Sequence, residues 1–215
     1  MRVAWVLRCF VLVVPVVLLA GACTGSDATP NLSSVAPAPA SSVVSSASVS
    51  PSVSVGYPAD VPLTGHNVRA GERPPVYPAA ARVHSQAGAN AFAEFFLLTW
   101  DWAYATTNPS YMRHYFGSTC GLCSGIASGI AKTAAENHRY EGGRFVVHSV
   151  RDTPIGPVTA PVDFCAAAYV DASAQTVVDH DGKIVNGEPP HSNVGFKLCM
   201  QSAAPSWRVT YWART

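Results

Sequence analysis

The segment from Gln86 to Thr106 constrains the fold more strongly than any other part of this sequence. Polar residues in it and just after it fall at spacings of four and seven, which is one narrow stripe of an α-helix. They are Asn90, Glu94, Asp101 and Asn108, and most of the remaining circumference is covered by Phe92, Phe95, Phe96, Leu98, Thr99, Trp102 and Ala103. We therefore predict a helix gripped by a curved sheet, because a helix this apolar must be covered on several sides.

Two shorter helices are predicted after the long one. Asn108 and Pro109 are typical of a helix start and predict a short helix over residues 110–116. A third helix is predicted from about residue 119 to His138. Alternation of apolar and polar residues then begins, so the predicted class is α+β, with helices first and antiparallel strands after them. The predicted strands are 145–151, 162–171, 193–201 and 207–214, with a hairpin over 176–185 that turns at His180-Asp181-Gly182.

The N-terminus predicts export and lipid attachment. Two arginines in the first eight residues precede an apolar run, which is the order of a secretory signal peptide. Small residues then lead to Cys23, and Leu19-Ala20-Gly21-Ala22-Cys23 resembles a bacterial lipobox, although Leu19 lies four positions before the cysteine instead of three. We interpret residues 1–22 as a lipoprotein signal peptide and Cys23 as the lipidation site, carrying diacylglyceryl and palmitate chains. The alternatives are a plain signal peptide cut near Ala22 and a permanent N-terminal anchor helix.

Residues 23–75 are predicted to form a disordered linker, and residues 76–215 the folded domain. The linker consists mostly of Ser, Ala, Val and Pro, a composition that cannot bury enough apolar surface to offset the entropy of ordering. A flexible chain of about 50 residues reaches on the order of 40 Å. That reach suits a domain held off a membrane.

The charge balance argues against a nucleic-acid partner. The chain has 14 basic and 13 acidic residues, and removal of Arg2 and Arg8 with the signal peptide leaves 12 against 13. A chain this close to neutral lacks the broad positive surface that nucleic acid requires.

The six cysteines predict two disulfides in an oxidising compartment. Cys9 leaves with the signal peptide and Cys23 is the lipid site, so four remain. Matching strand parity favours a Cys165–Cys199 bridge on the outer surface of the sheet, and Cys120 and Cys123 would then close a short ring at a helix start. The CxxC spacing also allows thiol redox chemistry or, with further ligands, a metal. The structural disulfide is the preferred interpretation, and we predict no metal site.

Two resemblances follow from these motifs. The long aromatic helix, two short helices and strands ending in Trp207–Trp212 resemble the nuclear-transport-factor-2-like cone, in which a strongly curved antiparallel sheet wraps the N-terminal helices. Over about residues 75–215, the chain is similar to an actinobacterial lipoprotein family catalogued as domain of unknown function 6318. Gly88-Ala89-Asn90-Ala91-Phe92, Cys120-x-x-Cys123 and Asp181-Gly182-Lys183 carry this similarity. The resemblance implies a fold and a cellular location, and it implies no activity.

The cone resemblance implies a pocket between the first helix and the concave face of the sheet. The candidate pocket residues are Asp101, Tyr104, Tyr111, His114 and His148. No pair among them has a spacing that requires general acid–base work, so no catalytic residue and no cofactor is predicted.

The favoured function is a membrane-tethered, extracytoplasmic lipoprotein that acts as a non-enzymatic binding module of the cell envelope. Its expected partners are membrane lipid through Cys23 and either an envelope protein or a small ligand. The first alternative is a small-molecule enzyme or carrier that uses the pocket, and whether the chain is an enzyme is left open. The second alternative is a thiol redox protein that uses Cys120 and Cys123.

Overall fold

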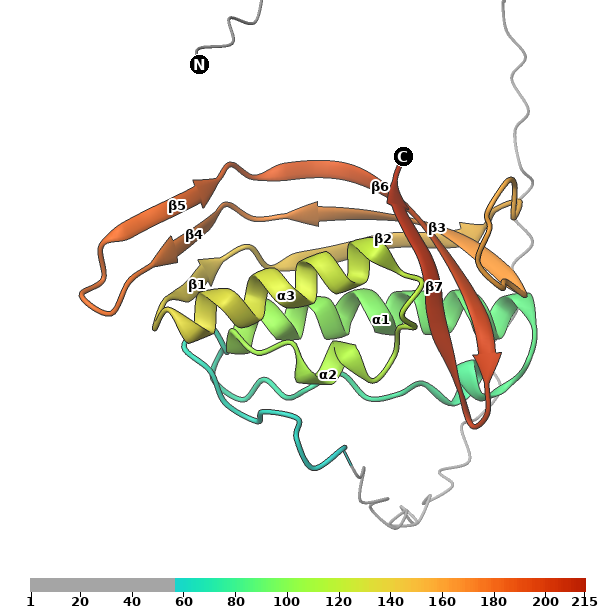
Figure 1. Ribbon diagram of the computed structural model, residues 1–215, viewed down its shortest axis with the longest axis horizontal. Helices are drawn as coiled ribbons and strands as arrows, with labels where there is room; N and C mark the ends of the chain where they lie inside the picture. The colour runs from blue at the N-terminus through green and yellow to red at the C-terminus, as the bar shows by residue number, and fades with distance from the viewer. Residues whose placement is uncertain (1–56) are drawn as a thin grey trace, which may run out of the picture. The chain divides into compact units, whose positions relative to one another are not determined.

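The computed structural model describes residues 57–215, and these form an α+β domain, as predicted (Figure 1). The predicted signal peptide, the predicted lipidation site Cys23 and the predicted linker up to residue 56 lie outside the described residues. The helical elements are η1 (Ala79–Arg82), α1 (Gln86–Thr106), α2 (Ser110–Arg113) and α3 (Gly121–Ala135). The strands are β1 (Arg139–Gly142), β2 (Phe145–Asp152), β3 (Phe164–Ala172), β4 (Gln175–Val178), β5 (Ile184–Glu188), β6 (His191–Ala203) and β7 (Ser206–Arg214).

The long helix α1 has the predicted bounds, and its ends are set by local interactions. Ser85 precedes it in an extended conformation, and its hydroxyl oxygen accepts a hydrogen bond of 3.1 Å from the Gly88 N–H. Gly88 is needed in this first turn because a Cβ there would collide with the carbonyl oxygen of Val83. At the other end, Thr107 takes a left-handed conformation that stops the helix.

The strands form two antiparallel sheets, and the chain passes between them from β3 to β4 and from β5 to β6. The larger sheet has the order β2-β3-β6-β7, and the smaller has the order β1-β4-β5. Because β4 follows β3 and β5 precedes β6, the smaller sheet extends the larger one at the end where the β4–β5 hairpin projects (Figure 1). α1 packs on β2 and β3, while α3 packs on β7.

The core lies between α1 and the larger sheet. Phe92, Phe96 and Trp102 of α1 are almost completely buried, and Leu198 and Met200 of β6 belong to the same cluster of buried side chains. The predicted alternation in β6 is therefore confirmed on its apolar face.

The third predicted helix is shorter than expected. α3 ends at Ala135, and residues 139–142 form β1, which pairs with β4 from Arg139↔Val178 to Gly142↔Gln175. Asn137 adopts a positive φ of 56° between the two elements, so the chain turns there and gains sheet pairing instead of another helical turn.

Residues 57–75 were assigned to the linker, but the structure places them against the domain. Val61 is buried, the Trp102 indole N–H donates to the Pro62 carbonyl at 2.9 Å, and the Tyr111 hydroxyl donates to the Pro75 carbonyl at 2.6 Å. The physical reason is that α1 is apolar on more sides than the sheet can cover. This segment shields the remaining side, so the described folded unit begins well before residue 76.

A buried arginine ties this segment to the helix and the sheet. Arg144, between β1 and β2, is 7% exposed, and its guanidinium donates to the Asp101 carboxylate at 2.7 Å and to the Asn67 carbonyl at 3.0 Å. It also donates to Glu72 at 3.1 Å, and this hydrogen bond lowers the pKa of Glu72. Each buried charge is therefore matched, which is the condition under which buried ions are tolerated.

We predict that Arg144→Met lowers the free energy of unfolding by about 3–5 kcal/mol, because Asp101 is left buried without its cation. Chemical denaturation measures this loss. The matched control is Arg139→Met, which removes an exposed pair with Glu141 and should cost less than about 1 kcal/mol. Equal losses in the two variants would contradict the structural role of Arg144.

Candidate functional site

A pocket of about 410 Å³ lies between α1, α3 and the strands of both sheets. Its volume falls within the range of small-molecule sites. Most of its lining is apolar, and the exposed members Leu122, Ser173, Glu188, Pro189 and Arg214 belong to its rim. The full lining is Trp100, Tyr104, Leu122, Ile126, Gly143, Phe145, Val170, Ala172, Ser173, Gln175, Glu188, Pro189, His191, Val194, Phe196 and Arg214. We refer to it as the α1–sheet cavity.

Aromatic rings form one wall of the α1–sheet cavity. Trp100 and Tyr104 are one turn apart on α1, so both rings project from the same face of the helix. The Trp100 ring lies 4.4 Å from Phe145 and 5.7 Å from Phe196, centroid to centroid, in edge-on contacts. A wall of this kind favours apolar and aromatic guests.

Two polar atoms on this wall bear on its chemistry. Burial raises the pKa of the Tyr104 phenol to about 12, and the neighbouring Trp100 indole offsets part of that rise. The Trp100 N–H lies outside hydrogen-bonding geometry with the phenol and has no other hydrogen-bond partner among the described residues, although Trp100 is only 8% exposed. The indole nitrogen is closed off by its neighbours, so Trp100 contributes its ring, and not its N–H, to the wall of the cavity.

The charged residues of the cavity lie at different places along the sheet. Glu188 pairs in register with Gln175, whereas Arg214 pairs with Phe196. Eight residue steps separate Glu188 from Phe196, which corresponds to at most roughly 26 Å, because Asn193 with φ 52° interrupts the extended chain. The acid and the guanidinium therefore lie toward opposite ends of the cavity.

Of the five candidate pocket residues, Tyr104 alone lines the α1–sheet cavity. Asp101 is engaged elsewhere, because its carboxylate accepts from Arg144 and, at 2.8 Å, from the Phe145 N–H. The Tyr111 hydroxyl is bonded to Pro75, and burial raises the pKa of Tyr111. These two side chains are structural.

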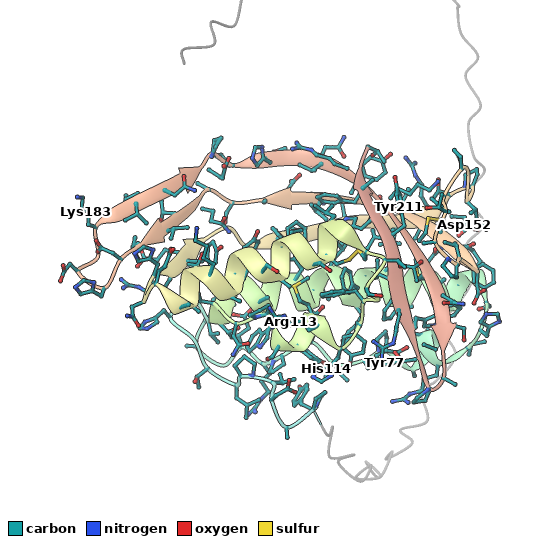
Figure 2. The ribbon with its side chains drawn as sticks, in the orientation of Figure 1. Tyr77, Arg113, His114, Asp152, Lys183 and Tyr211 are labelled. Carbon is teal, nitrogen blue, oxygen red and sulfur yellow. A yellow bond between two sulfur atoms is a disulfide. The ribbon has the colours of Figure 1, made fainter. Side chains whose placement is uncertain are left out.

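The two histidines also lie away from the cavity. His114 Nε2 is 2.7 Å from Asp60, and this hydrogen bond lowers the pKa of Asp60. His148 Nε2 is 2.7 Å from Asp171 and borders a separate hollow with Asn90 and Glu94. The prediction that these residues share a pocket with Tyr104 is wrong, because helix and strand positions alone do not show which side of the sheet each faces. Figure 2 shows His114 at the α2 side of the domain.

The sequence analysis missed the residues that define the cavity. Trp100, Phe145, Phe196 and Arg214 are absent from the pocket residues predicted from the sequence. The alternation of β6 could have identified Phe196, because it places this residue on the core face of the strand. Phe196 is the register partner of Arg214.

Both predicted disulfides are present, Cys120–Cys123 and Cys165–Cys199. The second joins direct register partners of β3 and β6, as predicted. Its expected place on the outer surface is wrong, because both cysteines are fully buried. The loop over residues 153–163 accounts for this: the Ile155 carbonyl accepts from Lys197, and the Pro161 carbonyl accepts from Thr210.

Residues 57–215 contain no group of three or more His, Cys, Asp or Glu side chains placed to hold a metal ion. Within the same range, every helix is too short or too polar to cross a bilayer.

The fold and the site define an α+β domain, stapled by two disulfides, with a partly open apolar cavity between its helices and its sheets. The chain belongs to the family of unknown function DUF6318, whose model matches residues 66–212. This match includes both disulfides and all the residues that line the cavity except Arg214.

The other comparisons add little. No curated protein matches the sequence. Among solved structures, the chain is similar to the intermembrane space region of the chloroplast protein ARC6, with 11% identity and a TM-score of 0.36. That alignment covers 58% of this chain and 95% of the other. A likeness at this level carries no argument about function.

Proposed function

We propose that this protein is a membrane-tethered, extracytoplasmic binding module that takes up a small apolar molecule in the α1–sheet cavity. The observation that carries the proposal is the cavity itself, with about 410 Å³ of space walled by Trp100, Phe145 and Phe196. Burying apolar surface against such a wall stabilises a complex by about 25 cal/mol for each Å² removed from water. A ligand for this site therefore needs an apolar body.

A binding role is better supported than catalysis. Tyr104 is the titratable group that α1 contributes to the cavity, and a phenol with a pKa of about 12 is a poor general acid or base near neutral pH. Glu188 and His191 lie in the lining without a hydrogen bond to one another, to Tyr104 or to any other described side chain. The enzyme alternative lacks a group poised for proton transfer.

The thiol redox alternative is also less well supported. Cys120 and Cys123 are disulfide-bonded and fully buried, and the Cys120 sulfur accepts from the Cys123 N–H at 3.3 Å. Exchange requires that a partner thiolate reach one of the two sulfurs. The burial of both sulfurs instead favours a structural disulfide at the start of α3.

We propose further that the α+β arrangement is a nuclear-transport-factor-2-like cone. The support is that α1 is buried along most of its length against the larger sheet, while the smaller sheet prolongs that sheet beyond the end of α1. In such a fold the cavity next to Trp100 and Tyr104 is the expected place for a ligand.

The membrane attachment is proposed from the lipobox-like sequence that ends at Cys23. Two disulfides in the described domain support an oxidising compartment, where such bonds persist. In this account the signal peptide directs export, Cys23 carries the lipid, and the residues up to 56 connect the lipid to the domain.

A photo-crosslinking experiment tests the cavity. The full chain in its native membranes is exposed to dodecanol that carries a diazirine, irradiated and digested, and the labelled peptides are mapped by mass spectrometry. We expect labels on α1 and β6 near Trp100 and Phe196. Val194→Trp, which fills the cavity from β6, should reduce this labelling at least about tenfold, because the guest loses most of its apolar contacts.

The matched control is Val146→Trp, the same substitution at a valine that is 58% exposed and does not line the cavity. It should leave labelling unchanged. Thermal unfolding of both variants shows whether Val194→Trp still folds. Labelling spread over the surface, or insensitive to a folded Val194→Trp, would contradict the binding function.

Lipid attachment is tested separately. We expect Cys23→Ala to release the protein from membranes into the soluble fraction, with the disulfides of the domain still formed. Fractionation followed by mass spectrometry measures this. A variant that stays membrane-bound and uncleaved would overturn the lipoprotein assignment.

A further inference from the structure

We propose that the ligand of the α1–sheet cavity is a single-chain anionic amphiphile, whose chain lies along Trp100 and Phe145 and whose head group binds Arg214. This inference rests on the binding function proposed above and names the chemical class of the ligand.

The alternation of β7 brings Arg214 to the cavity side of the sheet. Trp212 is 4% exposed and belongs to the core, and residues two apart on a strand share a face, so Arg214 lies on the face of Trp212. Tyr211 has the opposite parity and is 37% exposed; it is labelled on β7 in Figure 2. Arg214 therefore lies on the same face of β7 as the buried Trp212, at the end of the strand where this face becomes exposed to solvent.

The Arg214 backbone lies in the β6–β7 ladder, but its guanidinium has no hydrogen bond and no ion pair with any residue in the range 57–215. Other arginines are engaged: Arg144 holds two carboxylates, and Arg151 donates to the Tyr169 hydroxyl at 2.8 Å. A guanidinium presents five N–H donors in a planar fork that matches a carboxylate or a phosphate. At the rim of an apolar cavity, this fork is placed to receive the head group of a ligand whose chain is inside.

Aromatic rings pack around the same end of the cavity. Trp100 stacks edge-on with Trp212 at 4.7 Å and with Phe196, the register partner of Arg214. The Trp100 and Trp212 indole N–H groups are both buried without a hydrogen-bond partner among the described residues. Both nitrogens are closed off from the cavity, so the Arg214 guanidinium is the donor group that this end of the lining presents to a ligand.

The opposite end of the cavity sets the orientation. Glu188 lies there and would repel an anionic head, while it would attract a cationic one. An anion is therefore expected at Arg214 with its apolar tail directed away from it. A cationic amphiphile would bind in reverse, and the experiment below separates the two.

The volume limits the length of the chain. One water molecule takes up about 30 Å³ of the liquid, and we assign the same volume to each carbon of the chain. A cavity of about 410 Å³ then holds roughly a dozen carbons. A dodecyl chain is the appropriate probe.

The experiment compares three diazirine-bearing probes of equal chain length: dodecanoic acid, dodecanol and dodecylamine. Each is crosslinked to the full chain in native membranes, and only labels mapped to the cavity peptides are counted, relative to bulk lipid labelling. We expect the ionised acid to label about tenfold more than the alcohol, since a hydrogen bond to a charged group is typically worth that factor or more.

Arg214→Gln should lower labelling by the acid to the level of the alcohol, and labelling by the alcohol should stay the same. The matched control is Arg208→Gln, an exposed arginine of β7 between the buried residues Trp207 and Val209, which the β-bulge at Thr210 places on the face opposite to Arg214. This variant should preserve the preference for the acid. Thermal unfolding establishes that each variant folds.

The outcomes are distinct. Equal cavity labelling by acid and alcohol in the wild-type protein would overturn the anionic head group while leaving the binding function intact. Preference for the amine would assign the head group to the Glu188 end and overturn the role of Arg214. Absence of cavity labelling by all three probes would overturn the binding function itself.

Discussion

The structure depends on the burial of α1. This helix has large apolar side chains around most of its circumference, so no single layer can cover it. The larger sheet covers one side, and residues 57–75 cover another, where Trp102 donates its indole N–H to Pro62. Arg144 joins these parts, because its guanidinium contacts α1 through Asp101 and the covering segment through Glu72 and Asn67. Most of the domain is thus arranged around one helix.

The same helix creates the cavity. Toward its C-terminal end, Trp100 and Tyr104 face the region where the larger sheet gives way to the smaller one and where α3 contributes only Leu122 and Ile126 to the lining. Nearer the N-terminal end of α1, core side chains such as Phe92 and Phe96 are fully buried. The cavity is therefore a place where the coverage of α1 is incomplete, and a bound apolar molecule would complete it.

Much of the fold follows from local sequence patterns, whereas the site does not. The bounds of α1, the core face of β6, the hairpin turn near Asp181 and the pairing of Cys165 with Cys199 were predictable, because each depends on periodicity, turn residues or strand parity. The covering role of residues 57–75 was not, since their composition resembles a linker and only the contact with α1 orders them. The burial of the Cys165–Cys199 bridge by residues 153–163 depends likewise on tertiary contact. Arg214 joins the cavity only when β7 has paired with β6, and Asp101 leaves the candidate set only when Arg144 is brought to it.

The most direct test of the central claim is native mass spectrometry of the full chain isolated from its own membranes. The account predicts that the wild-type protein retains a small anionic amphiphile, seen as an added mass, and that folded Val194→Trp protein lacks it while Val146→Trp protein keeps it. A wild-type protein that carries no such mass, or a bound molecule that persists in folded Val194→Trp protein, would contradict the claim that the α1–sheet cavity is a binding site.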